Sequence, residues 1–332
     1  MYHCSQKYQL SSEYITTLDV TPDRLVVGTA SGEIILVPGG KLLEEQDYSI
    51  DVVGFSRDGE WLSGVGQGGR VWVWHRSELV TTLEQGDAWI DRLAWHPQAG
   101  EFVFSLGRYL QIWSKEIRDI VHTIDFTNSA VRTLDWHPQG EWLTTGGYQG
   151  IKSWFRPDWD RDPVCFDLPT SAEVVKWNPD GHYLAAITID GLVMIFDWLD
   201  DQFANFPWRL QGFPGKIRGL EWSGRHKLVT WSGTEIVVWK LHSDPLIGWE
   251  PTVLEGHTDL INVVSACTTN NLLASGGKDG LVIIWQGNKL HQTLLIEQEI
   301  TGIKWRNSNL IVATIDGEVW EWQNTRAKGF GK

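Results

Sequence analysis

Residues 257–285 show the pattern of apolar and polar positions that the rest of the chain repeats. Three largely apolar runs of strand length, Ile261–Ala266, Asn271–Ser275 and Leu281–Trp285, are separated by short polar or glycine-rich segments. Runs of this length that are rich in Val, Ile and Leu and bounded by Gly, Asn and Thr predict β-strands joined by tight turns. We therefore expect three consecutive antiparallel strands in this stretch.

The same arrangement recurs along the chain. In six units a glycine in the second turn is followed five residues later by an aromatic or large apolar residue, and two units with shorter turns end at Trp113 and Trp239. The eight strand-ending residues are spaced 37 to 46 residues apart, close to the ~40–45 residues of a four-stranded repeat. The six pairs are Gly32/Val37, Gly69/Trp74, Gly150/Phe155, Gly191/Phe196, Gly280/Trp285 and Gly317/Trp322.

A second signature closes the first strand of each unit. Turn-forming residues follow the strand, and four of the eight turns contain proline. Proline fixes φ, while Asp, Asn or Gly permits the chain to reverse, so these segments predict turns with a physical cause. Each of the two signatures occurs in eight units. The first strands end at Val20, Phe55, Trp95, Trp136, Trp177, Trp222, Ala266 and Trp305.

The combination resembles the WD40 repeat, one four-stranded blade of a β-propeller. The pair Gly256-His257 before the first strand and Trp285 at the end of the third carry the resemblance most clearly. It covers residues 6–322 and implies an all-β fold with a single propeller domain, followed by a C-terminal tail at 323–332. The repeat count predicts eight blades, and seven, the commoner number in the family, is the alternative.

The resemblance also implies a role for four polar or aromatic residues of the seventh unit. His257, Ser275, Asp279 and Trp285 match positions that form a hydrogen-bonded chain in the family, tying the third strand to the turns above it. A buried indole N–H and a buried imidazole both need hydrogen-bond partners. We therefore interpret this quartet as a device that stabilises the fold and not as a catalytic triad.

The two ends of the chain predict how the ring closes. Seven units carry a further strand-length run after the third strand, but only ten residues follow Trp322 in the eighth. The run Gln6–Leu10 precedes the first unit and has no unit of its own. Pairing Gln6–Leu10 with Glu318–Trp322 would remove two open sheet edges, and we predict that it closes the propeller.

Charge limits the classes of partner. The chain has 28 basic and 42 acidic side chains and a net charge of −14. A surface of that sign repels phosphate backbones and anionic lipid, so we expect no nucleic-acid or membrane partner. No apolar run approaches the ~18 residues of a membrane span, and the first ten residues lack the apolar core of a signal peptide. We therefore expect a cytoplasmic protein.

The sequence gives no metal-binding pattern. Cys4, Cys165 and Cys267 are too few and too scattered for a disulfide framework or a cysteine zinc site. His96 and His137 occupy the same turn position in neighbouring units, but zinc needs three or four ligands and no third is evident. We interpret both histidines as solvated turn caps and expect no metal or cofactor.

Charged residues are expected in the central channel. The residue before each strand-ending position should face it, and five of the eight are charged. Because their signs alternate in consecutive units, we predict an ion-paired run of Asp135, Lys176 and Glu221, with Asp19 and Lys304 also lining the channel. A catalytic metal would need carboxylates and histidines that converge without cations between them. The alternative is a small-molecule or metal-binding propeller enzyme that uses these channel residues.

The upper mouth of the channel is one candidate for binding partners. The resemblance implies that residues at the start of the first strands face other proteins there. Aromatic residues and arginine dominate interface hot spots, and the alternative is a set of scattered solvated side chains. The candidates are Tyr14, Trp89, Asp91, Arg132, Glu173 and Arg218.

The lower face is the second candidate. The links 156–163, 198–207 and 241–251 are long, rich in aromatic residues and belong to three consecutive units. We expect them to meet and form an apolar hot spot with an acidic rim, suited to a partner with a basic surface. The alternative is that the rings fold back into the propeller base. The aromatic candidates are Trp159, Trp198, Phe203, Phe206 and Trp249.

No enzyme motif is present. The chain has no Gly-x-Ser-x-Gly elbow, no phosphate-binding glycine loop and no His-Glu-x-x-His pair. The sequence therefore favours a non-enzymatic scaffold for protein–protein interactions.

Overall fold

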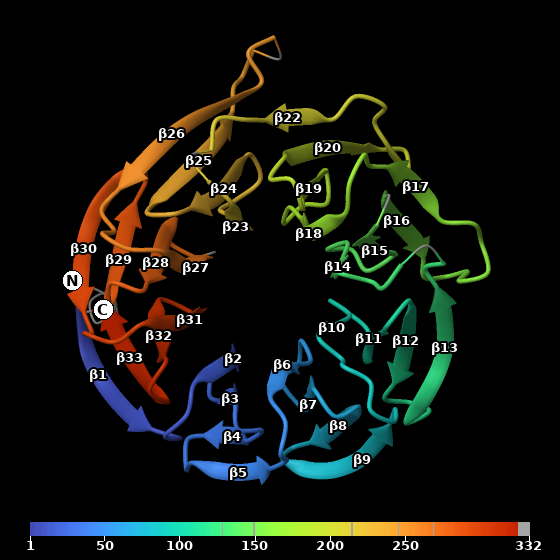
Figure 1. Ribbon diagram of the computed structural model, residues 1–332, viewed down its shortest axis with the longest axis vertical. Helices are drawn as coiled ribbons and strands as arrows, with labels where there is room; N and C mark the ends of the chain where they lie inside the picture. The colour runs from blue at the N-terminus through green and yellow to red at the C-terminus, as the bar shows by residue number, and fades with distance from the viewer. Residues whose placement is uncertain (128, 149, 214, 245, 268, 325–332) are drawn as a thin grey trace, which may run out of the picture.

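Eight antiparallel sheets stand around a common axis in the computed structural model (Figure 1). The structure describes residues 1–324 except 128, 149, 214, 245 and 268. Every regular element in this part of the chain is a β-strand. The predicted all-β propeller with eight four-stranded blades is confirmed. The fifth blade carries one additional short strand, β21 (Gln202–Phe203), beside its third strand.

Each blade runs from an inner strand to an outer strand in chain order. The inner strands are β2 (Ile15–Val20), β6 (Ile50–Phe55), β10 (Leu93–Trp95), β14 (Thr133–Trp136), β18 (Ala172–Trp177), β23 (Ile217–Trp222), β27 (Ile261–Ala266) and β31 (Ile300–Arg306). The second strands are β3 (Leu25–Thr29), β7 (Trp61–Gly66), β11 (Glu101–Leu106), β15 (Trp142–Gly147), β19 (Tyr183–Thr188), β24 (Lys227–Ser232), β28 (Leu272–Gly277) and β32 (Asn309–Thr314).

The third strands are β4 (Ile34–Val37), β8 (Arg70–His75), β12 (Tyr109–Ser114), β16 (Gly150–Phe155), β20 (Val193–Leu199), β25 (Glu235–Leu241), β29 (Leu281–Gln286) and β33 (Glu318–Asn324). The outer strands are β5 (Lys41–Glu44), β9 (Glu78–Glu84), β13 (Asp119–Asp125), β17 (Val164–Asp167), β22 (Trp208–Leu210), β26 (Trp249–Glu255), β30 (Lys289–Leu295) and, in the eighth blade, β1 (Tyr2–Gln9).

The apolar core lies in layers between neighbouring blades. The second strands β7, β15 and β28 are buried along their whole length, because each face of a blade packs against the blade beside it. This is why these strands combine apolar residues with small Gly, Ala, Ser and Thr residues and lack the apolar–charged alternation of a half-exposed strand. One such layer joins blades 3 and 4 through Val103, Leu143 and Trp154.

The first strand of the chain closes the ring. β1 pairs with β33 in antiparallel register, with Lys7 opposite Trp320 and Gln9 opposite Glu318, as predicted. The strand begins at Tyr2, four residues earlier than predicted, because the Tyr2 side chain is buried and its backbone exchanges hydrogen bonds with the side chain of Gln292 in β30. Gln323 and Asn324, assigned to the tail in the prediction, belong to β33; the rest of that tail, residues 325–332, lies outside the described residues.

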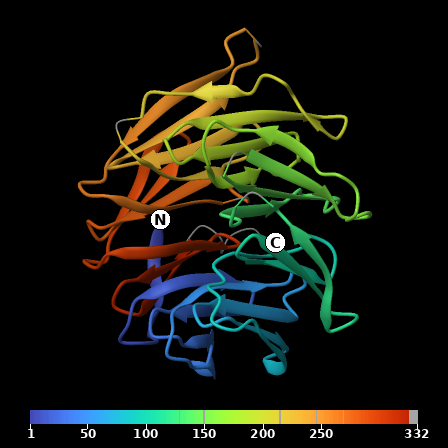
Figure 2. The same cartoon turned by 45° about the vertical axis from the view of Figure 1, so that its right-hand side comes forward.

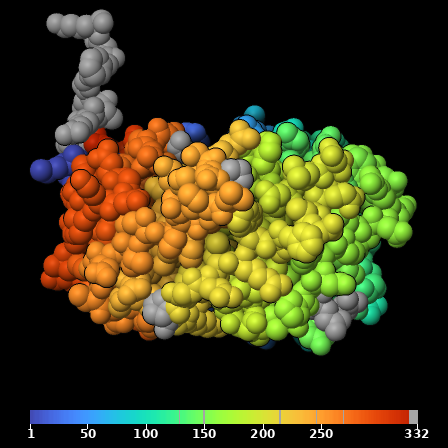
Figure 3. Space-filling view, turned by 90° about the horizontal axis from the view of Figure 1, so that it is seen from above, coloured from blue at the N-terminus to red at the C-terminus, as the bar shows by residue number. Residues whose placement is uncertain are grey.

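The alternating strand directions give the molecule two distinct faces. The links from an outer strand to the next inner strand lie at the same end of the propeller as the hairpins between second and third strands. We call this end the upper face. The hairpins between first and second strands and the links from third to outer strands form the lower face. Figure 2 shows the strands in an oblique view, and Figure 3 shows the blades stacked side by side in a flat drum seen edge-on.

Candidate protein-interaction surfaces

The polar quartet of the seventh blade forms one chain of hydrogen bonds. His257 Nδ1 lies 3.0 Å from Asp279 Oδ2, and His257 Nε2 lies 2.8 Å from Ser275 Oγ. The Trp285 indole donates to the same Ser275 oxygen at 2.9 Å. The His257 side chain is completely buried and that of Asp279 nearly so. The chain of contacts links the turn before β27 to β28 and β29.

His96 and His137 cap their turns by accepting backbone N–H groups, as predicted, but both are buried, so the expectation that they are solvated is wrong. His96 Nδ1 accepts the backbone N–H of Ala99 at 2.7 Å, so Nε2 carries the proton and donates to the Gly140 carbonyl oxygen of the next blade at 2.8 Å. His137 reaches the Gly181 carbonyl oxygen in the same way, at 3.1 Å. Burial lowers the pKa of both imidazoles. Each histidine therefore ties its blade to the following one.

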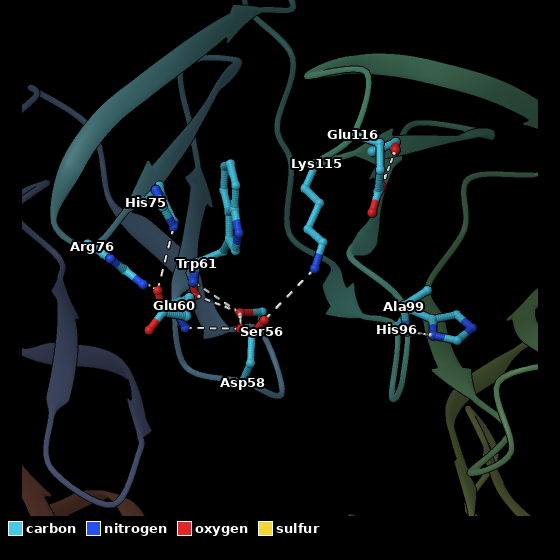
Figure 4. A network of polar contacts seen from close by, with 11 residues as sticks. Ser56, Asp58, Glu60, Trp61, His75, Arg76, His96, Ala99, Lys115 and Glu116 are labelled. Carbon is cyan, nitrogen blue, oxygen red and sulfur yellow. Dashed lines mark hydrogen bonds and ion pairs between the residues drawn. The ribbon is translucent and has the colours of Figure 1, made fainter.

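The corresponding turn of blade 2 is held by shorter side chains (Figure 4). Asp58 Oδ1 accepts the Ser56 hydroxyl at 2.6 Å and the Glu60 backbone N–H at 3.0 Å. Lys115 of blade 3 lies 3.9 Å from the other Asp58 oxygen. Figure 4 shows this network on the lower face with His96 on the neighbouring turn. These polar groups are engaged in holding turns and connecting blades.

The predicted charged run in the channel is present only in part. Lys176 Nζ lies 2.6 Å from Glu221 Oε2, and solvent reaches 38% of the Lys176 side chain. Asp135 makes no ion pair within the part of the chain that the structure describes, and its Oδ2 accepts the backbone N–H of Trp177 at 2.7 Å. Asp19 lies 3.7 Å from Lys304 across the junction of the first and last blades. The carboxylates are thus occupied by cations or backbone donors.

Asp135 has a perturbed pKa. Burial raises the pKa of this carboxyl from its ordinary value to about 6, against the opposing effects of the Trp177 N–H and the Lys176 ammonium. Burial also disfavours the charge on Lys176, but the nearby Glu221 and Asp135 carboxylates outweigh it and the Lys176 pKa is raised.

Replacing Asp135 with asparagine should change how stability depends on pH. The folded pKa lies above the unfolded one, so the folded protein binds more protons between pH ~4 and ~6, and this group's contribution to stability rises as pH falls from 8 to 5. Asparagine keeps an acceptor for the Trp177 N–H and carries no charge. We expect Asp135→Asn to raise the free energy of unfolding by about 1 kcal/mol at pH 8 and to leave it unchanged at pH 5. Denaturant unfolding of the two proteins at pH 8 and pH 5 measures the difference in the free energy of unfolding. An equal difference at the two pH values would contradict the raised pKa of Asp135.

The aromatic residues of the three long lower-face links do not form the expected exposed cluster, although two of the links contact the same residue: Arg161 lies over the Trp142 ring, whose indole N–H donates to Asp201 at 3.2 Å. Trp198 and Phe203 are buried with ring centroids 4.8 Å apart, and they fill the layer between blades 4 and 5. Trp249 packs against Trp222 at 5.8 Å, between blades 5 and 6. Trp159 is half-buried against Trp136 at 6.1 Å, in the layer between blades 3 and 4. Each link closes the bottom of a different layer, because an indole or phenyl ring is more stable there than in water.

Phe206 is the lower-face candidate that remains in solvent. Its side chain is 90% exposed, as is that of Leu246 at 94% on the link of the next blade. Figure 1 shows the β25–β26 link projecting outward from the ring, away from the β20–β22 link. Among the described residues of these two links, the exposed large apolar side chains are Leu199, Phe206, Leu246 and Ile247.

Ion pairs and hydrogen bonds engage Arg132, Glu173 and Asp91 among the upper-mouth candidates, and one pair is joined across two blades. Arg132 makes a two-pronged ion pair with Glu173, with Nε–Oε1 at 2.7 Å and Nη2–Oε2 at 2.9 Å. Asp91 accepts the Ser105 hydroxyl at 3.3 Å and lies 3.2 Å from Arg92. These contacts order the mouth of the channel while leaving the charged groups partly in solvent.

Two of the candidates keep more freedom to contact a partner. Arg218 is exposed and makes no ion pair with any described residue. Tyr14 is 39% exposed at the start of β2.

All exposed tyrosines and tryptophans lie on the upper face. Trp89 is the one exposed residue among the 21 tryptophans, all of which the structure describes. Its indole donates a hydrogen bond to Asp51 of the neighbouring blade, so the ring is held in place while 61% of it remains in solvent. The exposed tyrosines are Tyr14, Tyr48, Tyr109 and Tyr148, and each lies in or beside an upper-face link or hairpin.

Negative charge gathers on one side of this face. The links and hairpins from the start of β31 around to β10 expose six carboxylates, and the cations there are Arg92, which is half-buried, and Arg70, which is paired with the exposed Glu84 at the end of β9. The loops of blades 4 to 6 instead interleave acids with Arg132, Lys216 and Arg218. Tyr14, Tyr48 and Trp89 all lie within the acidic part. Its exposed carboxylates are Glu13, Glu45, Asp47, Asp87, Glu297 and Asp316.

The sequence prediction missed Tyr48, Tyr109 and Tyr148. It rested on fixed positions four and six residues before each strand end, whereas Tyr48 lies seven before Phe55 and the other two lie at hairpins. An aromatic residue inside a segment of Gly, Gln and Asp, where no strand requires it, is the signal that would have found them.

Among the described residues, no group of three or more His, Cys, Asp and Glu side chains is placed to hold a metal ion. The same part of the chain contains no helix that is long and apolar enough to cross a bilayer.

One known protein family matches two segments of the chain. The family model described as WD domain, G-beta repeat, matches residues 118–154 and 248–286. Each match begins in or near an outer strand and ends with the third strand of the next blade. No curated protein sequence matches the chain.

Two solved structures share the fold. Sqt1 from Chaetomium thermophilum superposes with a TM-score of 0.81 at 14% identity, covering 96% of this chain and 97% of that one. The computationally designed Ika8 protein superposes with a TM-score of 0.76 at 18% identity, covering 95% and 97%. At such identities the likeness concerns the fold alone.

Proposed function

We propose that this chain, a WD40-repeat β-propeller of eight blades, is a non-enzymatic scaffold that binds partner proteins through its upper face. WD40 propellers typically serve as protein-interaction scaffolds. One observation carries the choice of face: every exposed tyrosine and the one exposed tryptophan lie there. Tyr and Trp supply large contact areas at a low cost in conformational entropy and are enriched at binding hot spots.

The acidic part of the upper face supports a partner with a basic surface. Opposite potentials steer association and exclude partners of the same sign. The non-enzymatic assignment is supported by the channel, where Glu221 is paired with Lys176 and Asp135 is engaged by a backbone N–H.

Capture of partners from the cells that express the protein tests the proposal. We expect the triple variant Tyr14→Ser, Tyr48→Ser and Trp89→Ser to lose partner proteins at least about tenfold in quantitative mass spectrometry, because hot-spot residues each contribute about 2 kcal/mol or more. These side chains are exposed, so the melting temperature should change little.

The matched control replaces two exposed apolar residues of the lower face, Phe206→Ser and Leu246→Ser. This variant should capture the same partners as the unaltered protein. Unchanged capture by the upper-face variant, or loss of partners from the lower-face variant, would contradict the proposal.

A further inference from the structure

A cleft of about 570 Å³ opens on the upper face of blade 2. Its two walls are the links β5–β6 and β9–β10, and the turn between β7 and β8 lies at its base. Gln46 Nε2 donates to the Gln67 carbonyl oxygen at 3.1 Å and holds one wall against that turn. The cleft therefore has a fixed shape set by two neighbouring blades.

A glycine positions an aromatic ring at the edge of this cleft. Gly68 has φ of +96°, and a Cβ there would lie 2.8 Å from Cδ2 of Tyr48. Glycine thus lets the Tyr48 ring lie directly on the turn, while 57% of the residue stays in solvent. Trp89 stands two residues beyond the wall residue Asp87, and its indole is held by Asp51. Two aromatic side chains are fixed beside the cleft without being buried.

The cleft carries an excess of negative charge. Glu45, Asp47, Glu84 and Asp87 line it, and the one cation in its wall is Arg70, 3.4 Å from Glu84. The other three carboxylates make no ion pair with any described residue. Like charges held together in a concave site repel one another, and a cation entering the cleft would relieve that repulsion.

We propose that this cleft binds an arginine side chain on a basic segment of the partner protein, an inference that rests on the proposed scaffold function. A guanidinium matches carboxylate oxygens with two parallel hydrogen bonds and stacks on aromatic faces. Carboxylates and positioned rings are both present here within two successive links. The chemistry of the cleft therefore selects a planar cation over a neutral side chain.

Binding of labelled peptides to the full-length protein tests the assignment. The probe is a peptide of alternating arginine and serine, followed by fluorescence anisotropy, and its matched partners carry lysine or glutamine in place of arginine. We expect the arginine peptide to bind most tightly, the lysine peptide less tightly, and the glutamine peptide not measurably. Raising the salt concentration from about 50 to about 300 mM should weaken the binding of the arginine peptide, because exposed charge pairs are screened.

Variants locate the site. The double variant Glu45→Gln and Asp47→Asn should raise the Kd of the arginine peptide at least about fivefold, since each exposed charge contact corresponds to roughly a two- to fivefold change in affinity. Trp89→Ala should raise the Kd about tenfold. The control pair Glu255→Gln and Asp259→Asn removes two exposed carboxylates from the upper face of blades 6 and 7 and should change the Kd less than twofold.

Three results would overturn the assignment. Equal weakening by the control pair would show general attraction of a polycation to an acidic protein, and equal binding of the glutamine peptide would show that charge is not recognised. Equal binding of lysine and arginine peptides would overturn the guanidinium preference. Each of these outcomes leaves the scaffold function standing if the Tyr14, Tyr48 and Trp89 variant still loses its partners, whereas intact capture by that variant would remove the scaffold function itself.

Discussion

Deleting residues 1–12 should abolish the folded propeller. β1 is the outer strand of the last blade, so its loss leaves β33 as an open edge and separates the two ends of the chain. It also removes buried Tyr2 and the Lys7–Glu318 ion pair, whose atoms lie 2.7 Å apart. We expect a loss of at least about 5 kcal/mol in the free energy of unfolding, comparable to the whole stability of many domains, and aggregation through the exposed edge.

Thermal unfolding of the truncated and full-length proteins measures this effect. Because the truncated chain could fail to fold at all, co-expression with a peptide of residues 1–12 provides a second measurement. The peptide should add as a strand beside β33 and restore soluble protein. A truncated chain that melts at the same temperature as the full-length protein would contradict the account of ring closure.

Replacing Gly181 with alanine should strongly destabilise the protein, although it adds a single methyl group. Gly181 has φ of +78°, and its Cβ would lie 2.1 Å from Nε2 of the buried His137. The new residue must therefore accommodate a left-handed backbone and displace a ring that ties two blades together. We expect Gly181→Ala to lower the free energy of unfolding by about 3–4 kcal/mol, combining backbone strain with overpacking.

Gly191 supplies a matched control. Its φ is +82° and nothing lies within 4 Å of the position of an added Cβ. Gly191→Ala should therefore lower the free energy of unfolding through backbone strain alone, by about 1 kcal/mol. Adding His137→Ala to Gly181→Ala should recover part of the loss, because the collision is removed. Denaturant unfolding of the unaltered protein and these three variants measures the differences. Equal effects at Gly181 and Gly191 would show that the histidine contact does not limit the site.

The fold was predictable because each blade repeats the same local rules. Short apolar runs, turn residues and strand-ending aromatics recur with one period, and the leftover Gln6–Leu10 run indicated how the ring closes. The sequence did not reveal why tryptophan ends so many first strands. In the structure, Trp95 donates its indole N–H to the Gly54 carbonyl oxygen of the preceding blade at 2.8 Å, and Trp222 donates to that of Lys176 at 3.0 Å.

The surfaces were harder to predict than the fold. Whether an aromatic residue in a link faces solvent or the core depends on the depth of the layer beneath it, which the sequence does not state. Trp198 and Trp249 therefore became core residues, whereas Tyr48 became exposed because Gly68 leaves room for its ring on the turn. The burial of His96 and His137 was missed for the same reason, since the carbonyl that each contacts belongs to another blade.

Hydrogen exchange of the protein alone and in its captured complex tests the binding of partners through the upper face most directly. We expect slower exchange in the links 45–49 and 85–92 when partner proteins are bound, and unchanged exchange in the lower-face links 156–163 and 198–207. Protection confined to the lower-face links, with the upper-face links exchanging at the same rate in both states, would contradict the account.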